Sequence, residues 1–145
     1  MVDVGDKKVT SRTATARSII AMPAEVIAHF TGGDIQGKKG PVFQTAIIAG
    51  IMAAKKTGEL IPLCHPLGLD NCTIDISINK KQEVVIDCIA SLTAKTGVEM
   101  EALVGASIAA LTIYDMCKAM SHDIVIKETK LMEKTGGKRD FKRSK

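Results

Sequence analysis

The sequence predicts an α+β fold in which an antiparallel sheet is covered by helices on one face. Apolar and polar residues alternate within residues 10–22, 72–78 and 84–92, and this is the period of a half-buried strand. Two long runs of small and apolar residues, 41–56 and 95–120, are typical of buried helices. Strands joined by tight hairpins, with helices segregated to one face, define this class of fold.

The first elements follow in order from local signals. Residues 10–22 mix Thr, Ala and Ile with Arg, which suits a strand with one wet face. Pro23 opens a short helix over residues 23–30, and Gly32-Gly33 ends it. A glycine and lysine loop extends to residue 40, and the helix 41–56 closes at Thr57-Gly58.

The second half of the chain predicts a hairpin, a long helix and a last strand. The polar turn 79–82 joins strands 72–78 and 84–92, in which Cys72 and Cys88 are expected to be small core residues. The longest helix covers residues 95–120 and the last strand residues 124–134. Two largely apolar helices present more apolar surface than one layer of so small a chain can cover. We therefore expect an oligomer that buries the remainder.

Length and composition indicate a single globular domain over residues 1–145, with a basic tail from about residue 136 that we expect to be flexible. The hydrophobic fraction is 46% and the charged fraction 25%. No apolar run approaches the ~20 residues of a membrane span, and the N-terminus has no apolar signal segment. We therefore expect a cytoplasmic protein without membrane contact.

The composition also limits the partners and cofactors. A net charge of +4 suits an anionic ligand, but with no Trp, one Tyr and three Phe there is little to stack on bases, so nucleic acid is a poor candidate. The four cysteines lack the C-x-x-C spacing of zinc sites, and we expect thiols and no protein-held metal.

The segment "LIPLCHPL", residues 60–67, places Cys64 and His65 side by side between prolines that restrict the backbone. Neighbours in an extended segment point to opposite sides, so we expect one side chain inward and one outward. A packed loop with a satisfied histidine explains the segment equally well. If the segment is functional, His65 is the better candidate.

The start of the long helix carries two acids. Glu99 follows Thr96 in the S/T-x-x-E pattern of a capping box, which alone could account for it. Glu101 has no such explanation beyond the preference of the helix dipole for acids in its first turn.

The end of the same helix carries Asp115 and Lys118, three residues apart on one face. An ordinary surface ion pair is the simplest interpretation. The apolar residues around them favour partly buried surroundings instead, in which such groups transfer protons. Lys38 and Lys39, between two glycines, could bring positive charge and backbone amides to a phosphate, although the Walker pattern is absent.

Three segments in order, "LIPLCHPL", "KTGVEMEAL" and "ALTIYDMCKA", resemble the signature of the cyclic pyranopterin monophosphate synthase family of molybdenum cofactor biosynthesis. The resemblance extends from "MVDV" to "GGK", essentially the whole chain. It implies a ferredoxin-like subunit in a homohexamer, a trimer of dimers with active sites at dimer interfaces. It also implies a phosphorus-oxygen lyase that converts 3',8-cyclo-7,8-dihydroguanosine 5'-triphosphate to cyclic pyranopterin monophosphate and pyrophosphate.

The resemblance further implies the residues of the site and their roles. In this family pattern Asp115 and Lys118 transfer protons, and Lys39 and Arg12 bind the triphosphate. His65 faces the pterin-forming end of the substrate. The substrate-binding residues implied are Leu63, Cys64, His65, Glu99, Met100, Glu101 and Arg12, and the catalytic ones are Asp115, Lys118, Lys39 and His65. No cofactor is implied beyond a magnesium ion that the triphosphate could carry.

Two other functions stay open at this point. The same acids and lysines could serve a phosphate-ester or nucleotide hydrolase with a water nucleophile. A noncatalytic module that binds a small ligand is a third possibility, because the fold alone does not decide function.

Overall fold

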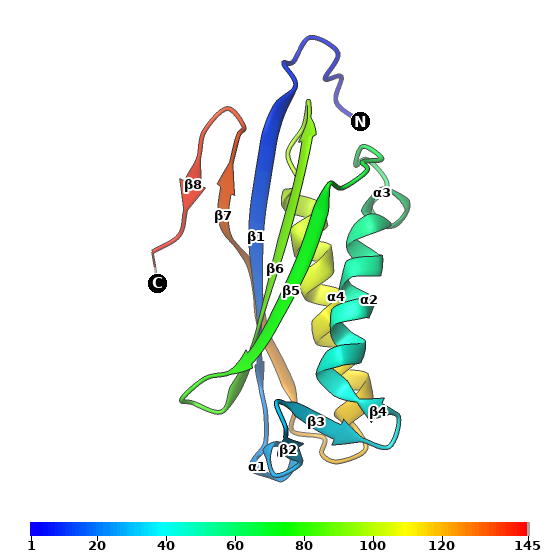
Figure 1. Ribbon diagram of the computed structural model, residues 1–145, viewed down its shortest axis with the longest axis vertical. Helices are drawn as coiled ribbons and strands as arrows, with labels where there is room; N and C mark the ends of the chain where they lie inside the picture. The colour runs from blue at the N-terminus through cyan, green and yellow to red at the C-terminus, as the bar shows by residue number, and fades with distance from the viewer. Residues whose placement is uncertain (145) are drawn as a thin grey trace.

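The computed structural model describes residues 1–144 as a five-stranded antiparallel sheet with helices on one face (Figure 1). The strands lie in the order β5-β6-β1-β7-β8. Their bounds are β1 Thr10–Ala21, β5 Asn71–Ile78, β6 Glu83–Ala94, β7 Val125–Thr135 and β8 Phe141–Lys142. The predicted α+β class, the four predicted strands and the hairpin of the second and third are confirmed.

Alternation along the strands places the core on one side of the sheet. In β1 and β6 every second residue is buried, and the buried side faces the helices. The helix α2 (Val42–Lys55) packs on β5, while α4 (Glu99–Cys117) packs on β1, β6 and β7. Taken along the chain, β1, α2, β5, β6, α4 and β7 form a βαββαβ order with β1 at the centre.

The two long helices lie against each other through glycines. A Cβ built on Gly50 of α2 would lie 2.7 Å from the carbonyl oxygen of Gly105 in α4. A Cβ on Gly105 would lie 2.5 Å from Cys88 Sγ in the sheet beneath. Only glycine leaves space for this approach, which explains why glycine stands at both positions.

The segment 23–41 differs from its prediction. The first helix, α1, covers only Ala24–Ile27, and three short strands follow it: β2 (Phe30–Thr31), β3 (Asp34–Gly37) and β4 (Gly40–Pro41). The expected helix end, Gly32-Gly33, is instead a two-residue hairpin turn, since both glycines have positive φ (60° and 83°). Pairing within this small sheet replaces the helix and the loop.

The long helix is shorter at both ends than predicted, since α4 spans Glu99–Cys117. It does reach the length and apolar composition of a membrane span, with a mean hydropathy of 1.3, against the expectation that no run would. However, 56% of that stretch is buried inside the molecule, as in the core helix of a globular domain. After α2, the residues Thr57–Leu60 form one more helical turn, α3, where a stop was expected.

The basic tail and the cysteines complete the fold. The strand β8, beyond the last predicted strand, pairs with Glu133 and Lys134 of β7, while Lys145 of the tail lies outside the described residues. All four cysteines are free thiols. Cys88 is buried as predicted, and Cys72 is half-buried with its Sγ 3.7 Å from that of Cys88.

Candidate active site

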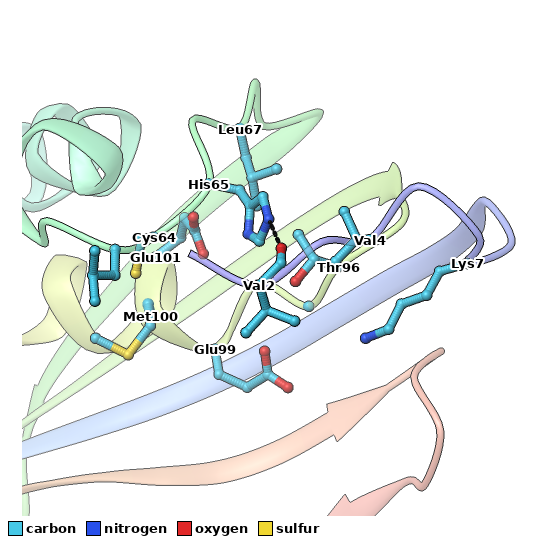
Figure 2. Close-up of a pocket in the computed structure, with 12 residues that line it drawn as sticks. Val2, Val4, Lys7, Cys64, His65, Leu67, Thr96, Glu99, Met100 and Glu101 are labelled. Carbon is cyan, nitrogen blue, oxygen red and sulfur yellow. Dashed lines mark hydrogen bonds between the residues drawn. The ribbon is translucent and has the colours of Figure 1, made fainter.

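A pocket of about 340 Å³ lies at the N-terminal end of α4 (Figure 2). Three segments line it: the N-terminal residues, the proline-flanked loop after α3, and the first turn of α4 with the residues before it. Six of the predicted substrate-binding residues line this one pocket: Leu63, Cys64, His65, Glu99, Met100 and Glu101.

The proline-flanked loop turns, and this brings Cys64 and His65 to the same pocket. The Cys64 amide donates to the carbonyl oxygen of Ile61 at 3.2 Å, so the segment is a turn at this point and not an extended chain. The expectation that one side chain points inward and the other outward is therefore wrong. Both are half-buried and line the pocket.

His65 is held by the N-terminal segment. Its Nε2 donates to the carbonyl oxygen of Val2 at 2.7 Å, and Figure 2 shows this contact. Because a carbonyl can only accept, Nε2 carries the proton in this contact. In the neutral ring, Nδ1 is then the nitrogen that can accept a proton.

Glu99 is not part of a capping box. The N-cap of α4 is Val98, and no side chain caps the helix there. Glu99 Oε1 instead lies 3.1 Å from Lys134 Nζ on β7, which is a tertiary ion pair. The local pattern beginning at Thr96 was misleading because the sheet offers Glu99 a charged partner.

Glu101 is buried, with an exposure of 3%. Its burial raises the pKa of the carboxyl group above the ordinary value, and the nearby charge of Glu99 adds to this effect. Burial also raises the pKa of the Cys64 thiol, and the Glu101 charge contributes to that shift. Glu101 is thus a carboxyl group poised to hold a proton beside the pocket.

The second group of predicted residues lies at the other end of α4. Asp115 accepts from Lys39 Nζ at 2.9 Å and pairs with Lys118 Nζ at 3.1 Å. These bonds, the one from Lys39 first, lower the pKa of Asp115. All three side chains line a second pocket of about 450 Å³.

The surroundings of this second group are more open than the sequence suggested. The side chains of Lys39, Asp115 and Lys118 are 63%, 49% and 60% exposed. The expectation of partly buried surroundings is wrong for one chain, because the apolar neighbours Met116 and Cys117 point into the core.

The two groups do not meet within one chain. Met100 and Asp115 stand near opposite ends of α4, about 22 Å apart along an axis that rises 1.5 Å per residue. Arg12 belongs to the first end. It is 9% exposed, donates to the carbonyl oxygens of Ala94 and Lys95, and lines a basic pocket that shares Lys7 with the His65 pocket.

Two lysines beside the first pocket were not predicted from the sequence. Lys134 contacts Glu99, and Lys7 lines the pocket near it. Nothing in the local pattern marks either residue, since one lies in a strand of mixed polarity and the other in a charged N-terminal segment. Within residues 1–144, no three His, Cys, Asp or Glu side chains form a group that could hold a metal.

Comparison with known proteins places the chain among its relatives. The sequence profile described as "MoaC family" matches residues 1–137. The chain is 54% identical to "Cyclic pyranopterin monophosphate synthase" of Xanthomonas campestris pv. campestris, over 97% of this chain and 86% of that protein. It is 51% identical to "Molybdenum cofactor biosynthesis protein 1" of Dictyostelium discoideum, over 95% of this chain but only 24% of that much longer protein.

A third relative is similarly close. The chain is 53% identical to "Molybdenum cofactor biosynthesis bifunctional protein" of Synechocystis sp., over 97% of this chain and 42% of that protein. A profile match over nearly the whole chain, with relatives above 50% identity, settles the family. The chain belongs to the MoaC family.

Proposed function

We propose that this protein converts 3',8-cyclo-7,8-dihydroguanosine 5'-triphosphate to cyclic pyranopterin monophosphate and pyrophosphate in molybdenum cofactor biosynthesis. The observation that carries the proposal is the 54% identity, along 97% of this chain, with a protein named for that product. The residues of both pockets support it, since the pockets are lined by acids, lysines and two histidines, His65 and His29.

The reaction requires acid-base catalysis and stabilisation of a charged leaving group. Hydrolysis at C8 of the guanine-derived ring and closure of the new pyrazine need protons to be given and removed. Closure of the cyclic phosphate forms a phosphorus-oxygen bond and breaks the one to pyrophosphate, so the leaving group needs its charge stabilised. The enzyme is thus a phosphorus-oxygen lyase.

The residues divide between these tasks. Lys118 and Asp115 transfer protons at the reacting centre, because the ammonium groups of Lys39 and Lys118 keep Asp115 ionised and hold Lys118 against it. Lys39 and Arg12 bind the triphosphate. His65 faces the pterin-forming end, with Nδ1 as the proton acceptor. Leu63, Cys64 and Met100 form the wall of the pocket that contains His65, and the acids Glu99 and Glu101 line the same pocket.

The active site is composite, with the His65 end of one subunit facing the Lys118 end of another. The separation of about 22 Å along α4 supports this arrangement, because one substrate molecule cannot bridge two pockets that far apart. The exposed apolar residues of the helices, Ile48, Met52, Leu60 and Leu111, and Leu63 of the proline-flanked loop support burial against a further copy. The assembly is a homohexamer, a trimer of dimers with sites at dimer interfaces.

Further properties complete the proposal. The βαββαβ order with β1 at the centre supports a ferredoxin-like subunit made of a single domain. The reaction needs no resident cofactor, although a magnesium ion can accompany the triphosphate. The partner is a small nucleotide-derived molecule and neither nucleic acid nor a membrane, and we expect the reaction to take place in the cytoplasm.

The product formed from the purified cyclic nucleotide substrate tests the function. Phosphorus NMR and mass spectrometry should show a cyclic phosphate and pyrophosphate in equal amounts. Formation of a nucleoside monophosphate instead would establish the hydrolase alternative, and substrate binding without any turnover would establish a binding module.

Mixing two inactive variants tests the composite site. His65→Ala and Lys118→Ala each damage one end of the site, so a mixed assembly contains interfaces in which both ends are intact. Random exchange of subunits should restore about a quarter of wild-type activity. If mixed assemblies form and no activity returns, both ends act from one chain.

A further inference from the structure

Asp34 is a buried carboxylate whose oxygens accept hydrogen bonds from backbone amides. It opens β3, is 7% exposed, and accepts three backbone hydrogen bonds from two separate segments. Its Oδ1 accepts from the amides of Ile35 and Phe43, both at 2.6 Å, and its Oδ2 accepts from the amide of Gln44 at 3.2 Å.

Through these bonds the side chain of Asp34 caps the N-terminus of α2, although Asp34 is not adjacent to this helix in the sequence. The residue at the N-cap position is Pro41, which makes no side-chain cap bond. Phe43 and Gln44 are the second and third residues of α2, and their amides are the ones that an N-cap side chain ordinarily satisfies. The negative charge also lies where the helix dipole favours it.

The chain between the two ends of this contact is the hairpin that carries Lys39. Gln36 pairs with Pro41 and Gly37 with Gly40, so Lys38 and Lys39 form the two-residue tip. At this tip Lys39 Nζ contacts Asp115. Asp34 therefore joins the start of the hairpin to the helix that follows it.

The hairpin also rests on the end of α4. A Cβ built on Gly37 would lie 3.4 Å from the carbonyl oxygen of Met116, next to Asp115 in the chain. Asp34 itself lies close enough to Cys117 for its charge to add to burial in raising the pKa of that thiol to about 11. The carboxylate thus lies between the hairpin, the start of α2 and the end of α4.

We infer that Asp34 is a positioning residue, which holds the hairpin 36–41 on α2 and so sets the place of Lys39 relative to Asp115. It does not touch the substrate. Two fixed ends make the tip a defined structure, and a lysine on a long flexible side chain reaches a phosphate best from a fixed backbone. The consequence for turnover rests on the proposed function, whereas the consequence for the hairpin does not.

A double-mutant cycle on the assembled protein tests the inference. Asp34→Asn replaces one acceptor oxygen by a donor and should lower turnover about 10–100-fold. In the Lys39→Ala background the same change should cost less than about twofold, because Asp34 acts through Lys39. An effect of equal size in both backgrounds would mean a general structural role and would overturn the inference.

Asp70→Asn is the matched control. Asp70 Oδ2 also accepts from a backbone amide, that of Thr93 at 3.1 Å, but away from the hairpin. This variant should keep turnover within about twofold of wild type. A loss as large as that of Asp34→Asn would contradict a specific role for Asp34.

Hydrogen exchange gives a measure that needs no enzymatic activity. In the wild type, the amides of Phe43 and Gln44 should exchange slowly although they lack intrahelical acceptors. In Asp34→Asn, but not in Asp70→Asn, the hairpin 36–41 should exchange faster. Unprotected amides in the wild type would overturn the inference even if Asp34→Asn failed to fold. If the proposed reaction itself is absent, these exchange rates alone decide the inference.

Discussion

At the scale of single residues, the same type of group has different chemistry at the two ends of α4. Glu101 is buried and its pKa is raised by that burial, whereas Asp115 is half-exposed and its pKa is lowered by Lys39 and Lys118. One carboxyl group is therefore suited to hold a proton and the other to stay ionised. Environments that divide acids in this way are typical of acid-base sites.

Substitution of Lys118 tests whether its exposed ion pair with Asp115 is catalytic. If Lys118 gives or takes a proton, Lys118→Ala should lower turnover by roughly 10²–10⁴-fold with folding and assembly intact. Lys118→Arg should bind substrate and fail to convert it, because arginine keeps the charge but does not release a proton. Near-normal turnover of Lys118→Ala, measured as cyclic pyranopterin monophosphate formed, would reduce the pair to a surface contact.

Cys64 should be dispensable for the chemistry. Burial raises the pKa of its thiol, so the thiol is protonated at neutral pH and is a poor nucleophile. Cys64→Ala should keep turnover within a few-fold of wild type. Loss of all turnover in a folded Cys64→Ala protein would show that the sulfur takes part in the reaction.

Glu101 should make stability depend on pH. Its folded pKa is raised, so its contribution to stability is complete below the unfolded pKa and is lost as the pH rises through the folded pKa. Glu101→Gln cannot ionise and escapes this loss. The variant should therefore melt a few degrees above wild type at neutral pH and match it in acid. Thermal unfolding followed by circular dichroism measures this, and equal differences at both pH values would contradict it.

At the scale of elements, the contact between α2 and α4 determines where both ends of the site lie. The helices meet at Gly50 and Gly105, of which Gly50 lies against Ile74 of β5 and Gly105 against Cys88 of β6. Because helices so closely packed cannot slide without clashes, the first and last turns of α4 keep fixed positions relative to the sheet and to the hairpin before α2.

Gly50→Ala tests this contact. Alanine favours helix by about 1 kcal/mol, yet its methyl group would clash with Ile74 Cδ1 and would lie 2.7 Å from the carbonyl oxygen of Gly105. We expect overpacking to exceed this gain and to lower the free energy of unfolding by about 1–3 kcal/mol. Gly68→Ala, where nothing lies within 4 Å of the added carbon, is the control and should be nearly neutral in chemical denaturation. A stabilised Gly50→Ala would show that the helices can separate at little cost.

At the scale of the whole molecule, the exposed apolar residues and the separation of the two pockets both support the proposed assembly. Ile48 is 59% exposed on α2 and Leu111 is 53% exposed on α4. Neither residue has a partner within residues 1–144 that covers it, and solvated side chains of this size favour burial by another subunit.

Ile48→Glu should dissociate the proposed hexamer. A charge placed in an apolar interface loses its hydration without gaining a partner, so sedimentation at micromolar concentration should show smaller species and turnover should fall with assembly. Lys80→Glu, in the exposed turn between β5 and β6, changes charge as well and should leave the assembly intact. A wild-type protein that sediments as a folded monomer would refute both the hexamer and the composite site.

The sequence by itself determined the sheet, its hairpin and the two long helices, because alternation and apolar runs are local patterns that each segment carries within itself. It also determined the family, since the motifs around His65, Glu99 and Asp115 are long and continuous. Local signals were weaker at 23–41, where turn glycines and small strands replaced a predicted helix and loop.

Only the tertiary structure decided how these motifs are arranged. The rise of α4 separates His65 from Lys118, strand register places Lys134 beside Glu99, and the hairpin fold brings Asp34 to the start of α2. Each of these contacts joins residues far apart in the chain or depends on how two elements pack. Their distances are set by the packing of helices on the sheet, and no local pattern in the sequence contains that information.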